Sequence, residues 1–149
     1  MPESVISKNE NIQTVIDILA QQLGEKIKTG QSIREQHSHT TTMIEPQLPD
    51  AVVFADCDAD IQSVVDVCAR YKVPIIPFGV GTSLEGHVNA PDGGISIDMS
   101  QLNQVIEVNN EDLDVVVQPG VTREWLNNYL RDSGLFFPID PGANASIGG

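Results

Sequence analysis

Residues 73–87 of the chain read VPIIPFGVGTSLEGH, and this stretch decides how the rest of the sequence is interpreted. Its first part, VPIIPF, is a short apolar run bounded by prolines, which predicts a buried β-strand. Its second part holds three glycines and a Thr-Ser pair but no lysine or arginine. A glycine-rich loop directly after a strand often binds phosphate through backbone N–H groups, so this loop is a candidate ligand site.

The loop does not fit the two common phosphate-binding patterns. It lacks the lysine of a P-loop, and the GxGxxG spacing fails because Leu84 stands where the third glycine is required. The next residues, HVNAPDGG, carry turn signals and cannot form the helix that this fingerprint needs. Since no cation lies between Lys72 and Arg123, bound phosphate would have to use backbone N–H groups and the hydroxyls of Thr82 and Ser83. A simple connector between two strands is the alternative interpretation.

Composition excludes several classes of protein. The 149 residues carry a formal charge of −13, so we expect no nucleic-acid partner and no anionic membrane surface. No apolar run approaches the roughly 18 residues of a membrane span. The first residues, MPESVISKNEN, resemble neither a signal peptide nor a transit peptide. Cys57 and Cys68 form no CxxC pair, which favours free thiols in a reducing compartment.

Hydrophobic spacing in the first half predicts two helices around a strand. Apolar residues at 12, 15, 16, 19, 23 and 27 indicate an amphipathic helix over 9–28 that stops near Gly30. AVVFA at 51–55 is typical of a buried strand. Asp58 is then a candidate N-cap for a helix whose expected inner face is Ile61, Val64, Val65 and Cys68.

The second half is predicted to be richer in strands. Strand signals occur at 73–78, 94–99, 104–108 and 113–118, and NNED between the last two suits a tight antiparallel connection. Thr122 should cap a helix that ends at Gly134 and buries Trp125, Leu126, Tyr129 and Leu130. Because helices and strands occur in the order α-β-α-β-β-β-β-α, we expect an α+β fold.

The segment HSHTTT at 37–42 is polar and contains two histidines. No third ligand lies close to His37 and His39 in the sequence, so a metal pair is not indicated. We therefore expect a solvated loop here, with no site role for either histidine and no metal in the protein.

Four blocks of the sequence point to one family. They are PIIPFGVGTSLEGHV, GGISIDMSQLNQVIEV, VVVQPGVTREWLNNYL and GLFFPIDPGANASIGG. In this order they resemble the FAD-binding domain of the vanillyl-alcohol oxidase and p-cresol methylhydroxylase flavoprotein superfamily, and most of all its D-lactate dehydrogenase and glycolate oxidase subunit branch. The chain departs from the family at His37, which relatives follow with an acidic residue and this chain with Ser38.

The resemblance implies a division of the chain and a fold. Residues 1–48 would be an N-terminal helix and a polar lead-in, and 49–149 the N-terminal part of an incomplete FAD-binding domain. That part would be a βαβ-like subdomain followed by mixed or antiparallel strands and a helix. The rest of the flavin domain and the substrate domain would lie outside these residues, so we name no catalytic residue.

The resemblance also implies which residues bind the cofactor. The loop would wrap the FAD pyrophosphate through Pro77, Gly79, Val80, Gly81, Thr82, Ser83 and Leu84, with Gly86 and His87 beside it. Pro119 and Gly120 would close a strand near the cofactor. The adenine and pyrophosphate end would be lined by Pro141, Gly142, Ser146, Ile147, Gly148 and Gly149.

Some members of the superfamily attach the flavin covalently through a histidine at the position of Thr82. A threonine hydroxyl does not form that bond, so we expect non-covalent FAD. Gly93, Gly94 and Gly134 are expected to serve turns only. Asp98 is expected to be a structural hydrogen-bond acceptor at the end of a strand.

The activity implied for the whole protein is oxidation of a small 2-hydroxy acid, of the D-lactate or glycolate type, to the 2-keto acid. Electrons would pass to a quinone, a cytochrome or a partner subunit. We expect a cytoplasmic protein, at most peripheral to the inner membrane. Two alternatives stay open: a non-catalytic nucleotide- or partner-binding module of the same fold, and an FAD oxidase of another branch that acts on sugars or aromatic alcohols.

Overall fold

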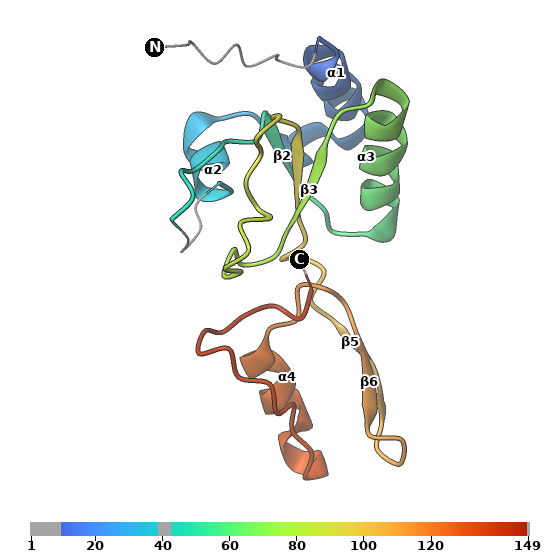
Figure 1. The fold of residues 1–149 in the computed structure, drawn as a ribbon. Helices are drawn as coiled ribbons and strands as arrows, with labels where there is room; N and C mark the ends of the chain where they lie inside the picture. Colours follow the sequence, from blue (N-terminus) through green and yellow to red (C-terminus); the bar gives the residue numbers. More distant parts are fainter. Residues whose placement is uncertain (1–9, 39–42, 149) are drawn as a thin grey trace.

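The computed structural model describes residues 10–38 and 43–148, which form two lobes (Figure 1). We call the described residues up to 102 the sheet lobe and residues 103–148 the hairpin lobe. In Figure 1 the sheet lobe lies above the hairpin lobe, and the last residues of the chain return to the junction between them. Each lobe has its own cluster of buried apolar side chains.

The sheet lobe is built on a four-stranded sheet with the strand order β1-β2-β4-β3. Both β2 and β3 pair in parallel with the central β4, and β1 runs antiparallel to β2 at one edge. The carboxyl ends of the three parallel strands therefore lie at one edge of the sheet, where open α/β sheets bind ligands. The strands are β1 (Ile27–Lys28), β2 (Ala51–Phe54), β3 (Ile75–Phe78) and β4 (Ile95–Asp98).

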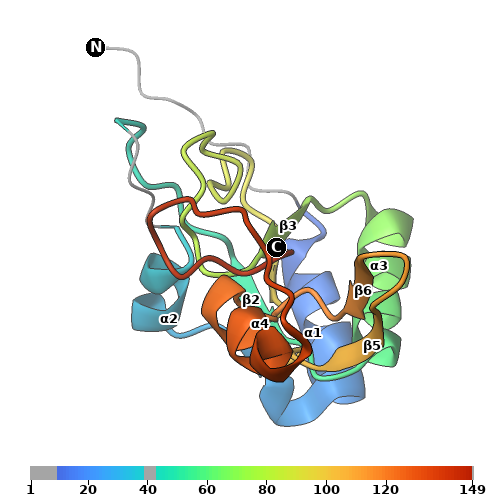
Figure 2. The ribbon, with the colours of Figure 1, turned by 90° about the horizontal axis from the view of Figure 1, so that it is seen from below.

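Helices cover both faces of this sheet. On one face lie α1 (Ile12–Leu23) and α3 (Asp58–Tyr71), and on the other lies the short α2 (Gln31–Gln36) (Figures 1 and 2). Because side chains alternate along a strand, Ile95 and Ile97 of β4 enter the core under α1 and α3. That core also contains Val15, Leu19, Val53, Val64, Val67 and Cys68.

The hairpin lobe consists of two antiparallel strands and one helix. The strands β5 (Val105–Asn109) and β6 (Asp114–Val117) pair across a turn, as the sequence predicted. The helix α4 (Arg123–Leu130) packs its Leu126 and Leu130 against them. Its first turn is capped as expected, since Thr122 Oγ1 accepts a hydrogen bond from the Trp125 N–H. Together the two lobes confirm the expected α+β class.

The prediction of one helix over 9–28 is wrong at its C-terminal end. The helix α1 ends at Leu23, because Gly24 adopts a φ of 56° that a helix cannot continue through. A 3₁₀ turn then leads into β1, where Ile27 pairs with Val53 although its spacing matched the helix. Gly30 precedes α2 instead of ending α1, and neither β1 nor α2 was predicted.

The inner faces of two helices were predicted only in part. In α3 Val64 and Cys68 are buried as expected, but Val65 is 40% exposed and Val67 occupies the inner position. In α4 the aromatic residues expected inside, Trp125 and Tyr129, are 48% and 53% exposed. The hairpin of β5 and β6 covers only a narrow stripe of α4, and Leu126 and Leu130 are the residues of α4 buried along that stripe.

The prediction that His37 lies in a solvated loop is also wrong. His37 is 4% exposed, and its Nε2 lies 2.8 Å from Asp98 Oδ2. This contact joins residues 61 positions apart, which no local pattern reveals. Asp98 ends β4 and accepts hydrogen bonds, as predicted. His39 lies outside the described residues.

Two further expectations concern thiols and membranes. Cys57 is exposed and Cys68 is buried, and both are free. Within 10–38 and 43–148 there is no helix with the length and apolar character needed to cross a bilayer.

Candidate functional site

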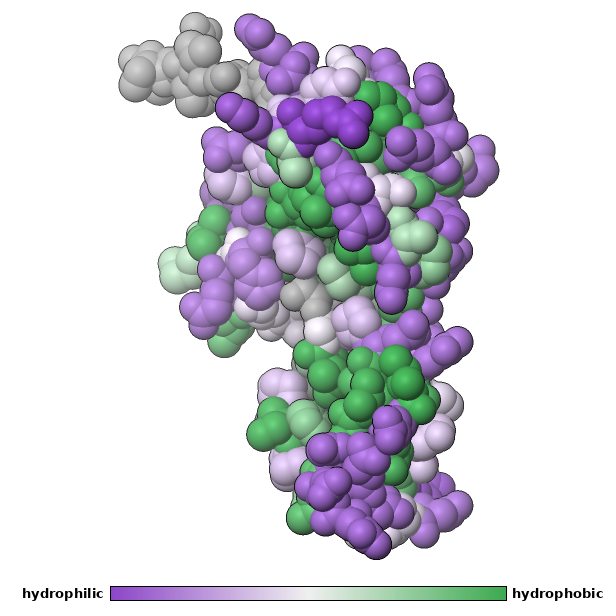
Figure 3. All heavy atoms as spheres, turned by 90° about the vertical axis from the view of Figure 1, so that its right-hand side faces the viewer, coloured by the Kyte–Doolittle hydropathy of each residue, from purple (hydrophilic) through white to green (hydrophobic). Residues whose placement is uncertain are grey.

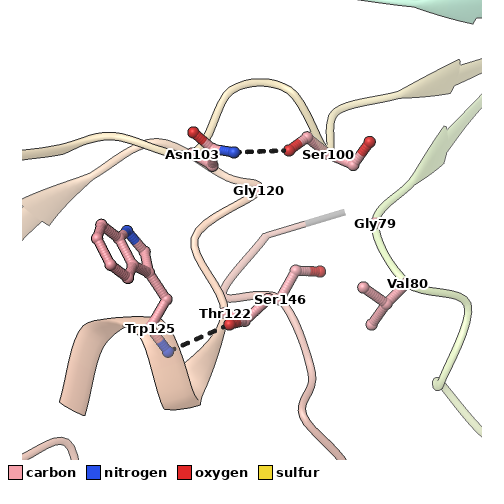
Figure 4. Close-up of a pocket in the computed structure, with 8 residues that line it drawn as sticks. All are labelled: Gly79, Val80, Ser100, Asn103, Gly120, Thr122, Trp125 and Ser146. Carbon is pink, nitrogen blue, oxygen red and sulfur yellow. Dashed lines mark hydrogen bonds between the residues drawn. The ribbon is translucent and has the colours of Figure 1, made fainter. Parts of the chain in front are cut away.

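Two adjoining hollows open where the lobes meet, and they share Gly79, Val80 and Ser146. We call the first, of about 320 Å³, the waist hollow (Figure 4). The second, of about 310 Å³, is the loop hollow, because most of its lining belongs to the glycine-rich loop after β3. That loop leaves the carboxyl end of its strand, where the sheet topology places a ligand site.

The loop hollow is lined by groups that can hold an anion. Gly81 adopts a φ of 67°, which favours glycine and lets the backbone curl. Within the part of the chain that the structure describes, the backbone N–H groups from Gly79 to Ser83 donate no hydrogen bond to another group. These N–H groups and the Thr82 hydroxyl are free to bind the oxygen atoms of a ligand. The Ser83 hydroxyl lies 3.2 Å from His87 Nδ1 and accepts a hydrogen bond from the Glu85 N–H.

The opposite wall of the loop hollow is the segment Ser146–Gly148, which runs beside the residues that precede α4. Its position is fixed by two backbone hydrogen bonds of 2.8 Å, from the Ile147 N–H to the Val121 carbonyl and from the Gly148 N–H to the Pro119 carbonyl. A Cβ on Gly148 would lie 2.6 Å from the Cβ of Pro119, so only glycine permits this approach. Pro119 therefore shapes this wall without lining either hollow.

The waist hollow adds residues that the sequence reasoning missed as site residues. They are Ser100, Asn103, Thr122 and Trp125, and Figure 4 shows them around the same space as Gly79 and Ser146. An indole ring next to hydroxyl and amide groups suits a ligand with an aromatic ring and sugar hydroxyls. The missed residues come from two turns and from α4, so no single motif could group them. Val88, which directly follows His87, lines the loop hollow and was also not predicted as a site residue.

The structure brings together most of the residues predicted for the site. Those that line one or both hollows are Gly79, Val80, Gly81, Thr82, Ser83, His87, Gly120, Pro141, Ser146, Ile147 and Gly148. Those that line neither are Pro77, Leu84, Gly86, Pro119 and Gly142. The last predicted residue, Gly149, lies outside the described residues.

Lysine and arginine are absent from the lining that the structure describes for both hollows. Arg123 is near in the sequence, but its guanidinium lies 3.6 Å from Asp140 and 3.8 Å from Glu124. A ligand phosphate in the loop hollow would therefore be held by N–H and hydroxyl groups and by water, as the cation-free sequence predicted.

A cluster of potential metal ligands lies elsewhere, at Asp56, Cys57 and Asp60. Lys26 Nζ already fills it, at 2.8 Å from Asp56 and 2.7 Å from Asp60. Burial alone would raise the pKa of Asp60, but hydrogen bonds from Lys26, from the Asp56 backbone N–H and from the Cys57 side chain lower the pKa below its ordinary value. The cluster is thus held by Lys26, which joins the 3₁₀ turn before β1 to the start of α3.

Comparison with known proteins identifies the family. The family model described as an FAD binding domain matches residues 49–149. The chain belongs to this FAD-binding family. The match begins just before β2 and contains both hollows, so the glycine-rich loop and the Ser146–Gly148 wall are parts of the domain.

Curated relatives narrow the branch. The chain is 41% identical over 144 residues to a probable mitochondrial D-lactate dehydrogenase of Danio rerio, covering 96% of this chain and 29% of the relative. It is 50% identical over 102 residues to a mitochondrial D-lactate dehydrogenase [cytochrome] of Arabidopsis thaliana, covering 68% of this chain and 18% of that one. A glycolate oxidase subunit, GlcD of Bacillus subtilis, is 33% identical over 76% of this chain and 24% of its own length. The chain thus spans less than a third of these relatives.

A solved structure shows the fold. p-Cresol methylhydroxylase with substrate bound superposes over 100% of this chain and 30% of its own, with a TM-score of 0.76 and 19% identity. This confirms the p-cresol methylhydroxylase-type fold that the four sequence blocks indicated.

Proposed function

We propose that this chain is the FAD-binding portion of an oxidoreductase that converts a small D-2-hydroxy acid, of the lactate or glycolate type, to its 2-keto acid. The loop hollow would hold the pyrophosphate of FAD, and the waist hollow the adjoining nucleoside part. When bound, FAD supplies the hydride acceptor of such a reaction. The chain's own residues bind and orient the cofactor.

The observation that carries this proposal is the set of N–H groups from Gly79 to Ser83 that have no partner among the described residues. The loop that carries them lines a hollow together with Ser146–Gly148, and the described lining holds no lysine or arginine. A diphosphate that is held permanently needs hydrogen-bond donors, whereas a phosphoryl group to be transferred needs cations at its leaving oxygen. The donor set therefore suits a resident dinucleotide better than a nucleotide substrate.

The substrate and the electron acceptor rest on the named relatives. Two of them are called D-lactate dehydrogenases, one with a cytochrome in its name, and one a glycolate oxidase subunit. We extend this to the present protein as a 2-hydroxy acid substrate and a cytochrome, quinone or partner-subunit acceptor. A cytoplasmic location, at most peripheral to a membrane, stays a prediction, as does the division at residue 49 into a lead-in and a flavin domain.

The proposal is tested by Gly81→Val in the flavin-loaded protein. Valine adds a branched side chain where φ is 67° and where the backbone must approach phosphate, so FAD should be lost on gel filtration. The matched control is Gly134→Val, because Gly134 has a φ of 76°, meets nothing within 4 Å of an added Cβ, and lines neither hollow. Both variants should lose about 1–2 kcal/mol of stability from backbone strain.

Only Gly81→Val should lose the visible flavin bands. Equal flavin retention by the two variants would contradict the assignment of the loop. Acid precipitation of the loaded protein tests the attachment: all yellow colour should enter the supernatant, since Thr82 offers no covalent link. Colour in the pellet would overturn non-covalent binding while leaving the loop assignment intact.

A further inference from the structure

His37 stands directly after α2, on the sheet face opposite α1 and α3, and is almost fully buried. Its ring meets side chains from three strands. The ring centroid lies 4.4 Å from that of Phe78 at the end of β3 and 5.6 Å from that of Phe54 at the end of β2. Asp98 at the end of β4 meets Nε2. The imidazole thus touches all three parallel strands at the edge where the hollows open.

Both ring nitrogens of His37 face hydrogen-bond acceptors. Nδ1 lies 2.8 Å from the Ile33 carbonyl oxygen of α2, and Nε2 lies 2.8 Å from the Asp98 carboxylate. A neutral imidazole carries one N–H, so only the imidazolium can donate both hydrogen bonds. Within the described residues Asp98 is the charged group in contact with the ring; α2 offers a carbonyl, and β2 and β3 offer phenyl rings.

Asp98 is suited to hold that imidazolium. Burial alone would raise the pKa of its carboxyl group, but hydrogen bonds from His37 and Ser100 outweigh this and keep the pKa below its ordinary value. Each carboxylate oxygen of Asp98 has its own partner: Oδ2 lies 2.8 Å from His37 Nε2, and Oδ1 accepts a hydrogen bond of 2.8 Å from the Ser100 N–H. The pair is therefore continuous with the turn that follows β4.

The residues fixed by this pair lead directly into the candidate site. Phe78, under the His37 ring, is followed by Gly79, which lines both hollows. Ser100, bound to the other oxygen of Asp98, lines the waist hollow. A movement of the His37 ring would thus shift Gly79 through the adjacent Phe78, and Ser100 through Asp98, two residues before it.

Stability alone is a poor reason for such a pair. Burying two charges costs about as much as their attraction returns, and apolar replacements of buried ion pairs are often neutral or stabilising. The opposite face of the same sheet packs on an apolar cluster that includes Leu19, Val64 and Ile97. A buried ion pair at the carboxyl ends of the strands is better explained by the need for one fixed geometry there.

We propose that His37, in its doubly protonated form, is a positioning residue for FAD: through Asp98 and Phe78 it fixes the strand ends from which Gly79 and Ser100 shape the two hollows. This rests on the proposed function. When the ring loses a proton, one of its two hydrogen bonds is lost, and the strand ends gain freedom. Loss of that proton at higher pH should therefore weaken FAD binding.

The first test measures the FAD dissociation constant of the protein between pH 5.5 and 8.5. The wild type should weaken about tenfold over this range, the equivalent of one lost hydrogen bond to a charged group. His37→Gln and Asp98→Asn should bind about tenfold more weakly at low pH and show no step. The double variant should match the singles, because all three remove one interaction.

Two controls separate this effect from others. His87 lines the loop hollow and could itself make binding depend on pH, so His87→Asn must keep the step. Lys26→Gln breaks the pair with the buried Asp60 at the β1 edge, away from β3, and should lower stability without changing the step. A step that persists in His37→Gln, or disappears in His87→Asn, overturns the proposal.

A second test needs no cofactor. In the imidazole ¹⁵N spectrum, both nitrogens of His37 should carry protons at low pH, and the Gly79 and Ser100 amide signals should shift together with the ring. Loss of the ring proton with both amide signals unchanged overturns the positioning role. If wild-type protein binds no FAD but the amides follow the ring, the proposed function fails and the coupling between His37 and the hollows stands.

Discussion

The two lobes bury their apolar residues to very different degrees. In the sheet lobe every residue of β4 is buried, and Val53, Val64 and Ile95 are fully inaccessible to solvent. In the hairpin lobe no residue of β5 or β6 is fully buried. Exposed there are Ile106, Leu113, Val116, Trp125, Tyr129, Phe136 and Ile139. Figure 3, which faces the β6 side, shows apolar surface gathered on this lobe next to the junction.

The two walls of the site therefore differ in how firmly the rest of the protein supports them. The sheet lobe has helices on both faces and holds the glycine-rich loop on a sheet with a sealed core. In the hairpin lobe, Trp125 lies on α4, and Ser146–Gly148 runs beside the residues that precede this helix. The helix packs on a two-stranded ribbon, which is marginal alone in water. Packing of the hairpin lobe against further protein surface would cover the apolar side chains and stiffen the second wall.

The largest effect that separates the lobes is expected from Ile97→Ala. Ile97 is 2% exposed in the centre of the sheet, so its truncation should cost about 2–5 kcal/mol in urea unfolding. Ile106→Ala is the matched change in the hairpin lobe, where the side chain is 63% exposed, and should cost under about 0.5 kcal/mol. Similar losses for both variants would show that the hairpin lobe is as tightly packed as the sheet lobe.

A smaller effect is expected from acid. Asp60 and Asp98 both have a pKa below the ordinary value, and both belong to the sheet lobe. A carboxyl whose pKa is lower when folded stabilises the fold above its unfolded pKa and loses that contribution as the pH falls through its folded pKa. The melting temperature should therefore drop below about pH 4. Asp98→Asn should flatten this drop; an unchanged profile would contradict the role of Asp98.

In both lobes, how much the sequence predicts depends on whether the signal is local. The sequence predicts the strands β2, β3 and β4 from their apolar runs, and it predicts the turn between β5 and β6 from its polar residues. These signals are local. The six residues of α2 lack an apolar period, and burial of His37 depends on Asp98, 61 residues away. Trp125 fits the helical period of α4 but faces the waist hollow, since the neighbouring strands are too narrow to cover it. Local periodicity therefore predicts where helices and strands lie, but it does not predict which other element each of them packs against.

The smallest effect concerns thiol chemistry and leaves the fold unchanged. Burial raises the pKa of the Cys68 thiol to about 11, so its thiolate is about a hundredfold scarcer at neutral pH than that of an ordinary thiol. Iodoacetamide should label the exposed Cys57 and leave Cys68 unmodified, as peptide mapping can show. Val116→Cys, on a half-exposed strand, should be labelled like Cys57. Protection of this new thiol would mean that β6 is covered.

The alternation along β4 has a consequence for how the chain reaches its fold. Ile95 and Ile97 face α1 and α3, while Ser96 and Asp98 are buried on the other face. A slip of β4 by one residue against its two parallel partners would exchange these sets and place a carboxylate among aliphatic side chains. The polar residues of β4 thus destabilise sheets that form in the wrong register during folding. A strand with two apolar faces could pair in either register with little loss of stability.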